Sequence, residues 1–269
     1  MRNSVRPVLV ASLTLALLAG FGTVSAFANQ GAGLGTSTGG DVNTRGETVP
    51  LTVQRAAARK QAAAASYVHA KRLRARSASI ATAGQAATKV LDVRHYGQIK
   101  SFYCGPASGK MILKYLDAGP SRYNHRLQTQ RRIGGPAHMA TDVNGKTSWA
   151  SGLFRVGLNR WREGKSDGFY VDKHDPSVSY FTNALTLDVD RGYPFGADTV
   201  EVAGGVHYNG HPTNQTIGHW IVAHGYFGGG TSTRFADPST TVWSTPSDHF
   251  TYTTSDFVNR FLNQNGITW

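Results

Sequence analysis

The sequence predicts an α+β domain over residues 88–269, and two observations carry this prediction. Residues 104–120, CGPASGKMILKYLDAGP, place apolar side chains at helical spacing, and Gly119-Pro120 ends the pattern. Residues 219–227 and 233–238, HWIVAHGYF and TRFADP, have the composition of two strands. Helical and strand-like segments therefore share one domain.

The first 28 residues have the pattern of a secretory signal peptide. Arg2 and Arg6 give a positive start, residues 8–20 are almost wholly apolar, and small residues offer cleavage after Ala26 or Ala28. A run of about 13 apolar residues is shorter than the roughly 20 that a membrane span needs. We therefore expect a secreted protein, extracellular or associated with the cell wall, without a transmembrane segment.

Residues 29–87 are predicted to form a flexible basic segment that could serve as a pro-segment. Residues 29–48 are rich in Gly, Thr and Asn and offer almost nothing to bury. Residues 53–88 are rich in Ala and Arg, so their helix propensity is high, but few large apolar residues mark a face. We expect either a transient helix or an inhibitory pro-segment that becomes ordered only against the domain.

The net charge of +12 lies mostly before the domain. Residues 1–87 contain 10 Lys and Arg against 2 Asp and Glu, whereas residues 88–269 contain 18 against 14. The basic arm could contact an anionic cell wall or membrane surface. Its basic residues are not interleaved with aromatics and no recognition motif accompanies them, so we expect no specific nucleic-acid partner.

Further elements are predicted inside the domain. Residues 151–161, SGLFRVGLNRW, indicate a second helix, although two glycines weaken the pattern. Residues 168–173, GFYVDK, and residues 199–211, TVEVAGGVHYNGH, read as strands and turns. The pair Asn209-Gly210 is a strong signal for a tight turn.

Cys104 is the only cysteine in the chain and begins the first predicted helix. A single cysteine makes no internal disulfide, so the fold must rest on its apolar core. At a helix N-terminus, the backbone N–H groups and the helix dipole favour the nucleophilic thiolate, and the Cys104 amide faces an oxyanion formed on an attacked carbonyl. Gln98 is a candidate second donor to that oxyanion. The alternative is a small buried residue that fills space.

His219 and Asp237 are the candidate partners of the thiol. A nucleophilic cysteine needs a base and a group that orients the base. Side chains alternate along a strand, so His219 and His224 point to opposite faces and only one of them can face Cys104. We choose His219, because it begins the strand at the rim of a cleft. If the two strands are antiparallel neighbours, Asp237 lies beside His219 and can hold its ring by a hydrogen bond.

These motifs resemble those of papain-like cysteine peptidases. The resemblance rests on Gln98, C-G-P-A at 104–107, G-H-W-I-V-A-H-G-Y at 218–226 and D-P at 237–238. It is strongest to peptidase family thirty-nine, the bacteriocin-processing, double-glycine-leader peptidase family, and its secreted stand-alone relatives. The resemblance implies a papain-like fold in which an N-terminal helix carrying the cysteine packs on an antiparallel sheet carrying the histidine and aspartate.

The resemblance also implies roles for four residues. Cys104 would be the nucleophile, His219 the general base and acid, Asp237 the residue that orients the base, and Gln98 an oxyanion donor. It implies a cysteine-type peptidase that hydrolyses peptide or protein substrates through a thioacyl-enzyme without a cofactor. We expect the protein to be a monomer.

Three alternative functions stay open. A cell-wall peptide amidase or an acyl transferase would use the same triad, and a binding module could retain the scaffold without catalysis. A metal site would draw on Cys104 and on the histidines crowded between residues 207 and 224. The histidine spacing argues against a metal, because the histidines diverge in a strand or flank a turn and show no helical register. The four histidines are His207, His211, His219 and His224.

Overall fold

The structure of the protein is a computed structural model that describes residue 40, residues 49–78 and residues 87–269. The predicted signal peptide, residues 1–28, lies outside the described residues, as do residues 29–39, 41–48 and 79–86 of the predicted flexible segment. In the described part of the chain, no helix is long and apolar enough to cross a membrane.

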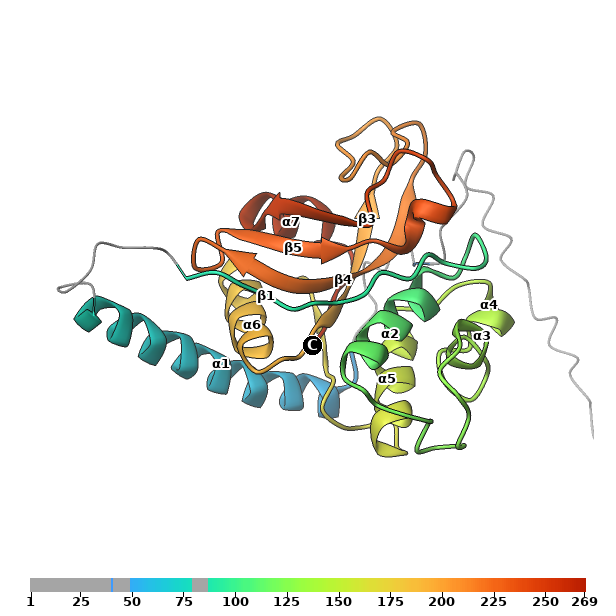
Figure 1. The fold of residues 1–269 in the computed structure, drawn as a ribbon, viewed down its shortest axis with the longest axis horizontal. Helices are drawn as coiled ribbons and strands as arrows, with labels where there is room; N and C mark the ends of the chain where they lie inside the picture. Colours follow the sequence, from blue (N-terminus) through green and yellow to red (C-terminus); the bar gives the residue numbers. More distant parts are fainter. Residues whose placement is uncertain (1–39, 41–48, 79–86) are drawn as a thin grey trace, which may run out of the picture. The chain divides into compact units, whose positions relative to one another are not determined.

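Figure 1 shows the helices and strands of the described chain. The helices are α1 (Leu51–Ala78), α2 (Cys104–Tyr115), α3 (Gln130–Ile133), α4 (Thr141–Asn144), α5 (Leu153–Glu163), α6 (Val178–Asp190), the 3₁₀ helix η1 (Pro238–Thr241) and α7 (Thr254–Phe261). The strands are β1 (Lys89–Val90), β2 (Asp172–His174), β3 (Phe195–Glu201), β4 (Ile217–Phe227), β5 (Ser232–Ala236), β6 (His249–Thr253) and β7 (Gly266–Thr268). The predicted α+β class is confirmed, and so are helices at the two predicted positions, α2 and α5.

The strands form one antiparallel sheet in the order β2-β7-β3-β4-β5-β6, and β1 pairs with β4. Strands β4 and β5 pair across a short loop whose register starts at Phe227↔Ser232. Gly228, Gly229 and Gly230 all have positive φ angles, which glycine adopts without strain, so this loop reverses the chain tightly. The predicted antiparallel neighbours are therefore confirmed.

Strand β3 lies earlier in the sequence than predicted. The prediction assigned residues 199–211 to strands and turns, whereas β3 ends at Glu201 and a loop follows. Asn209 and Gly210 have φ angles of 51° and 74°, and the N–H of His211 donates to the carbonyl of Tyr208, which confirms the tight turn. The turn reverses the direction of the chain within this loop and does not join the two strands of a hairpin.

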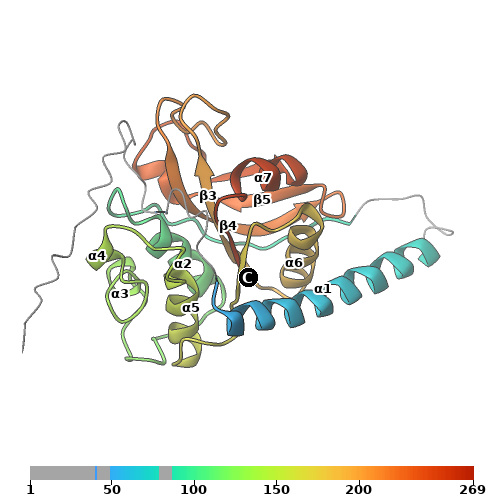
Figure 2. The same ribbon diagram turned by 180° about the vertical axis from the view of Figure 1, so that it is seen from behind.

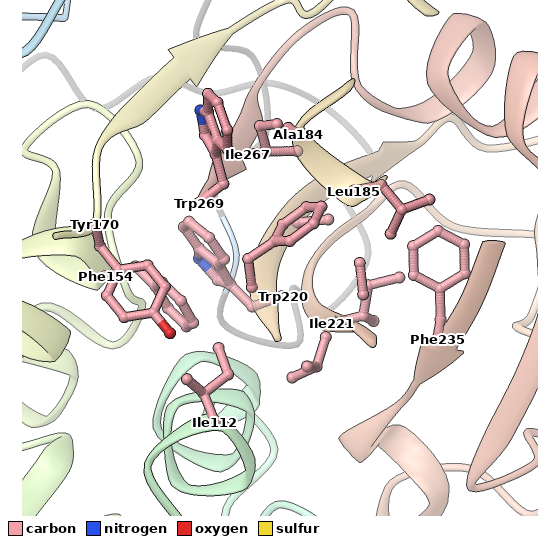
Figure 3. Packing of buried hydrophobic residues seen from close by; sticks show 14 of the residues in the cluster. Ile112, Phe154, Tyr170, Ala184, Leu185, Trp220, Ile221, Phe235, Ile267 and Trp269 are labelled. Carbon is pink, nitrogen blue, oxygen red and sulfur yellow. The ribbon is translucent and has the colours of Figure 1, made fainter. Parts of the chain in front are cut away.

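Strand β4 is buried on both faces, and only Phe227 at its end is partly exposed. Successive side chains of a strand point to opposite faces, so helices must cover both. On one face, Phe154 of α5 stacks on Trp220 with ring centroids 4.1 Å apart. On the other, Ile221 lies near Leu185 of α6 and Phe235 of β5 (Figure 3). The core thus fixes β4 firmly between the helices.

Helix α1 packs against α6, and the two helices cross at a steep angle in both views (Figures 1 and 2). Its buried side chains follow helical spacing and are small, namely Val53, Ala57, Ala64 and Val68. Small side chains let two helices approach closely, so a docking face exists although few large apolar residues mark it.

Two lysines anchor α1 to the end of α6. Lys60 Nζ lies 2.9 Å from Asp188 Oδ2, and Lys71 Nζ lies 2.5 Å from Asp190 Oδ2. Lys60 also lies 3.8 Å from the centroid of the Phe169 ring, a cation–π distance. Residues 51–78 thus form a helix packed on the domain, which corresponds to the second expected state, a segment ordered against the domain, and an inhibitory role stays a prediction.

Candidate active site

Cys104 is the first residue of α2, and its side chain is buried. Pro106 occupies the first turn, where its missing N–H costs no helical hydrogen bond. The positive end of the helix dipole therefore lies at the sulfur. The prediction that Cys104 begins a helix is confirmed.

Gly105 allows a neighbouring loop to approach the start of α2. A Cβ on Gly105 would collide with Thr147 Oγ1 and lie 2.5 Å from Thr147 Cβ. Thr147 is held there by a hydroxyl contact of 2.7 Å with Thr141 and by Trp220, whose Nε1–H donates to the Thr147 carbonyl at 3.0 Å. The glycine after the cysteine therefore serves close packing beside the sulfur.

Ser108 joins the helix of the cysteine to the strand of the histidine. It lies four residues after Cys104 and so on the same face of α2. Its hydroxyl donates to the carbonyl of Trp220 at 2.9 Å, and both groups are buried. Trp220 directly follows His219, so the face of α2 that carries Cys104 meets β4 next to His219.

His219 and Asp237 form a buried pair. Nε2 of His219 lies 2.8 Å from Oδ1 of Asp237, and both side chains are fully buried. The register Val222↔Ala236 carries Asp237 past the end of β5 and back alongside the start of β4. A neutral His219 that donates from Nε2 has its lone pair on Nδ1, where it can take a proton. The predicted proximity of these two residues is confirmed.

Three further groups hold the Asp237 side chain, namely the Ser239 N–H, the Asn209 amide and His211. Oδ1 accepts from the backbone N–H of Ser239 at 2.9 Å, which caps η1, and Oδ2 accepts from Asn209 Nδ2 at 2.7 Å. Burial alone would raise the pKa of the Asp237 carboxyl, but the charges and hydrogen bonds of His219 and His211 hold that pKa well below its usual range. Asp237 is therefore a carboxylate at neutral pH.

His211 extends the pair into a buried chain of four groups. Its Nε2 lies 2.9 Å from Asp237 Oδ2 and its Nδ1 lies 2.6 Å from Glu201 Oε2. Burial by itself lowers the pKa of His211, but the hydrogen bonds to Asp237 and Glu201 raise it to about 9. His211 is thus an imidazolium between two carboxylates, and its charge offsets one of them.

Only a weak signal in the sequence indicates this role of His211. The Asn209-Gly210 turn was predicted, and a histidine directly after a tight turn returns toward the strand that precedes it. In the sequence, His211 stands out only as a member of the histidine cluster, and no pattern marks Glu201.

The geometry can be compared with known families. A sequence model of the Peptidase_C39 like family matches residues 90–267, about two thirds of the chain. The chain belongs to this family. The resemblance to peptidase family thirty-nine and the papain-like α+β fold are thereby confirmed. A search of curated proteins found no match.

Membership of the C39-like family supports a cysteine peptidase. The family match does not assign roles to single residues. The roles of Cys104, His219, Asp237 and Gln98 therefore stay predictions, which the geometry of the C39-like domain can support.

Gln98 lies close to the site, but its side-chain amide already donates hydrogen bonds to two backbone carbonyls. Its backbone is tied to η1, because its N–H donates to the carbonyl of Pro238 at 3.0 Å. Its side-chain Nε2 donates to the carbonyls of Lys100 and Ser101 at 2.9 and 2.7 Å, so both amide hydrogens bind within its own loop. The C39-like domain thus holds Gln98 in a local turn, and an oxyanion role requires the amide to turn away from these carbonyls.

Three side chains of the C39-like domain could in principle hold a metal ion. Among the described residues, one ligand atom each from His211, His219 and Asp237 lie within 4.8 Å of one another. These atoms already hydrogen-bond with each other. His207 and His224 lie outside this group, since their rings bind the carbonyls of Val202 and Leu91 instead. The four histidines that the sequence offered as metal ligands therefore do not come together in one site.

Proposed function

We propose that this C39-like protein is a secreted cysteine peptidase that hydrolyses peptide bonds through Cys104, His219 and Asp237. The observation that carries the proposal is the fully buried His219–Asp237 pair at 2.8 Å. His219 lies on β4, and the hydroxyl of Ser108 links this strand to α2, the helix that begins with Cys104. Secretion rests on the signal pattern of residues 1–28.

The first half of the reaction acylates the enzyme. Nδ1 of His219 takes the thiol proton while the sulfur of Cys104 bonds to the carbonyl carbon of the substrate. The backbone N–H of Cys104 donates to the oxyanion that forms. The intermediate then breaks its C–N bond, His219 gives the proton to the leaving amine, and a thioester on Cys104 remains.

The second half releases the acid. Water attacks the thioester while His219 takes one of its protons, and the C–S bond breaks. His219 returns the proton to the sulfur, so the thiol is restored. Asp237 keeps the His219 ring oriented by its hydrogen bond to Nε2 and stabilises the imidazolium that forms in both halves.

The test is cleavage of a mixed peptide library under reducing conditions, with mass-spectrometric readout of the cleaved bonds. We expect the wild-type chain to cut a subset of peptides and Cys104→Ala to cut none of them. Unchanged cleavage by Cys104→Ala would overturn the proposal.

The same experiment separates the other functions. A free amine added to the reaction would be joined to the acyl product if the enzyme is an acyl transferase. A wild-type chain that cuts nothing and whose thiol reacts slowly with an alkylating reagent would indicate a binding module, because a catalytic thiolate reacts quickly near neutral pH.

A further inference from the structure

His211 and Glu201 are buried charged residues to which the proposed reaction assigns no part. Nδ1 of His211 lies 2.6 Å from Glu201 Oε2, its Nε2 lies 2.9 Å from Asp237 Oδ2, and all three side chains are fully buried. A buried ion pair is by itself weak evidence for stability, because removing its charges from water costs much of what the pairing returns. The cluster lies directly behind Asp237, one residue removed from the proposed base, His219.

The tight turn at Asn209-Gly210 brings two donors to one oxygen of Asp237. Asn209 Nδ2 donates to Oδ2 at 2.7 Å, and Nε2 of His211 lies 2.9 Å from the same atom. The other oxygen, Oδ1, lies 2.8 Å from Nε2 of His219. With Oδ2 occupied in this way, the carboxylate presents Oδ1 to His219 in one orientation.

Glu201 keeps a proton on the far side of the His211 ring. Burial lowers the pKa of His211, but its hydrogen bonds to Asp237 and Glu201 raise it to about 9, so both ring nitrogens carry a proton at neutral pH. The imidazolium and the two carboxylates then carry together one net negative charge, the same as Asp237 would carry alone. Without that proton, the buried cluster would hold two negative charges behind His219.

The charge of His211 lies close enough to act on His219. The two ring centroids are 5.3 Å apart, and the rings meet edge to face at 82°. A positive charge at about 4–6 Å disfavours a second positive charge on a neighbouring group. His211 thus favours the neutral form of the His219 ring, which is the form that accepts the thiol proton.

Two other titratable side chains lie on the same side of the cluster. The Tyr208 ring lies 4.7 Å from that of His211, but burial, and then the charges of Glu201 and Asp237, raise the pKa of Tyr208 well above its usual value, so it stays neutral. Nδ1 of His207 lies 3.9 Å from Glu201 Oε1, beyond hydrogen-bonding distance. His211 is therefore the group of this loop that carries charge to the Asp237 carboxylate.

Two further titratable groups approach from other elements. Nε2 of His95 lies 2.8 Å from the backbone carbonyl oxygen of Asp237, and its Nδ1 lies 3.2 Å from Asp248 Oδ1. Asp198 precedes Glu201 by three residues on β3, so the two side chains lie on opposite faces of the sheet. His211 differs from His95 in that its ring contacts the Asp237 carboxylate itself.

We propose that Glu201 and protonated His211 are positioning residues for the proposed reaction: His211 orients Asp237 and favours a neutral His219, and Glu201 holds the proton on His211. The inference rests on the proposed function, since it assigns both residues to the reaction of Cys104, His219 and Asp237. Neither residue touches the reacting atoms, so each acts through Asp237.

The test compares four full-length chains, namely wild type, His211→Gln, Glu201→Gln and Asn209→Ala. The rate of Cys104 alkylation by iodoacetamide is measured against pH, and the quantity compared is the pH at which the rate reaches half of its maximum. Because Cys104 is the only cysteine, alkylation reports on one position and needs no peptide. The kcat and KM for a cleaved peptide are measured over the same pH range. EDTA is present throughout, since His211, His219 and Asp237 could also hold a metal ion.

The variants should differ in the direction of the shift. His211→Gln removes a positive charge and should raise the midpoint by about one pH unit. Glu201→Gln removes a negative charge and should leave the midpoint at or below the wild-type value. Asn209→Ala removes a neutral donor from the same oxygen of Asp237, so it should lower kcat without moving the midpoint. A loss of packing would lower the rates in all three variants without this order of midpoints.

A measurement on the wild type covers a variant that does not fold. At pH 8, a histidine with an ordinary pKa of about 6.5 is neutral and holds a proton on one ring nitrogen. The NMR spectrum of the wild-type chain labelled with ¹⁵N-histidine should show a ring that keeps both protons at pH 8 and loses one near pH 9. A spectrum without a doubly protonated ring at pH 8 would overturn the inference.

The outcomes separate this inference from the proposed function. Equal alkylation midpoints in the wild type and His211→Gln overturn the inference, even when cleavage depends on Cys104. The expected order of midpoints without cleavage of any peptide by the wild type supports the coupling of these residues to the thiol and overturns the peptidase.

Discussion

His211 carries a positive charge between the buried carboxylates of Glu201 and Asp237. Its pKa rises from 6.5 to about 9, so folding is favoured by its protonation. This contribution is fully present below about pH 6.5 and is lost as pH rises through about 9. A pKa change of this size corresponds to about 3 kcal/mol of stability.

We therefore predict that the free energy of unfolding of the wild-type chain falls relative to that of His211→Gln between about pH 6.5 and 9. Urea unfolding at several pH values measures it. The control is His224→Gln, because burial lowers the His224 pKa to about 4 and its contribution changes only below about pH 6.5. Parallel pH curves for the wild type and His211→Gln would contradict the charge assigned to His211.

The oxyanion role of Gln98 can be tested by substitution. If its amide turns to donate to the oxyanion, Gln98→Ala should lower kcat by about 10²-fold with little change in KM. Gln130→Ala is the matched control, because Gln130 holds the same loop through the carbonyl of Gly97 and the N–H of Ile99. Steady-state kinetics decide between the two roles. An equal loss in both variants would show that Gln98 shapes the loop and donates nothing to the reaction.

The site residues whose positions were predicted all lie in segments with a clear local sequence pattern. Cys104 was placed by helix spacing, while His219 and Asp237 were placed by two strands joined by one short loop. His211 and Glu201 could not be placed this way, because their contact depends on how the loop after β3 folds back. The engaged amide of Gln98 depends likewise on loop geometry that composition does not specify.

The helices and strands likewise differ in whether a local sequence pattern predicted them. Helices α2 and α5 and strands β4 and β5 have strong periodic patterns, and each was expected. Helix α6 was not, because its sequence VSYFTNALTLDVD contains four β-branched residues and one Asn, which have modest helix propensity. Its helix is set by the Ser177 cap, which accepts from the N–H of Tyr180, and by packing between α1 and β4.

For α1, the sequence showed a clear helix propensity but did not show that the helix packs on the domain. Alanine contributes little to a hydrophobic pattern, yet Ala57 and Ala64 are almost fully buried. The specific anchors are polar and distant in sequence, as in the Lys60–Asp188 pair. Burial lowers the pKa of Lys60 to about 8 despite the nearby Asp188, which indicates how little water reaches the contact.

At the scale of the whole molecule, the basic arm has two distinct sets of charges. Lys60 and Lys71 form ion pairs with the domain, so they add nothing to an outward-facing positive surface. Five arginines on the same helix are exposed, namely Arg55, Arg59, Arg72, Arg74 and Arg76. Contact of the basic arm with an anionic wall or membrane surface stays a prediction, and on α1 these exposed arginines are the residues that could make it.

The central claim is that Cys104 forms a thioester with the substrate. The most direct measurement is the mass of the chain after rapid acid quenching during turnover of a cleaved peptide, followed by mapping of the fragment that contains residue 104. We expect a population of chain heavier by the acyl part of the N-terminal product, with the added mass on Cys104. An unmodified cysteine during turnover, together with cleavage by Cys104→Ala, would contradict it.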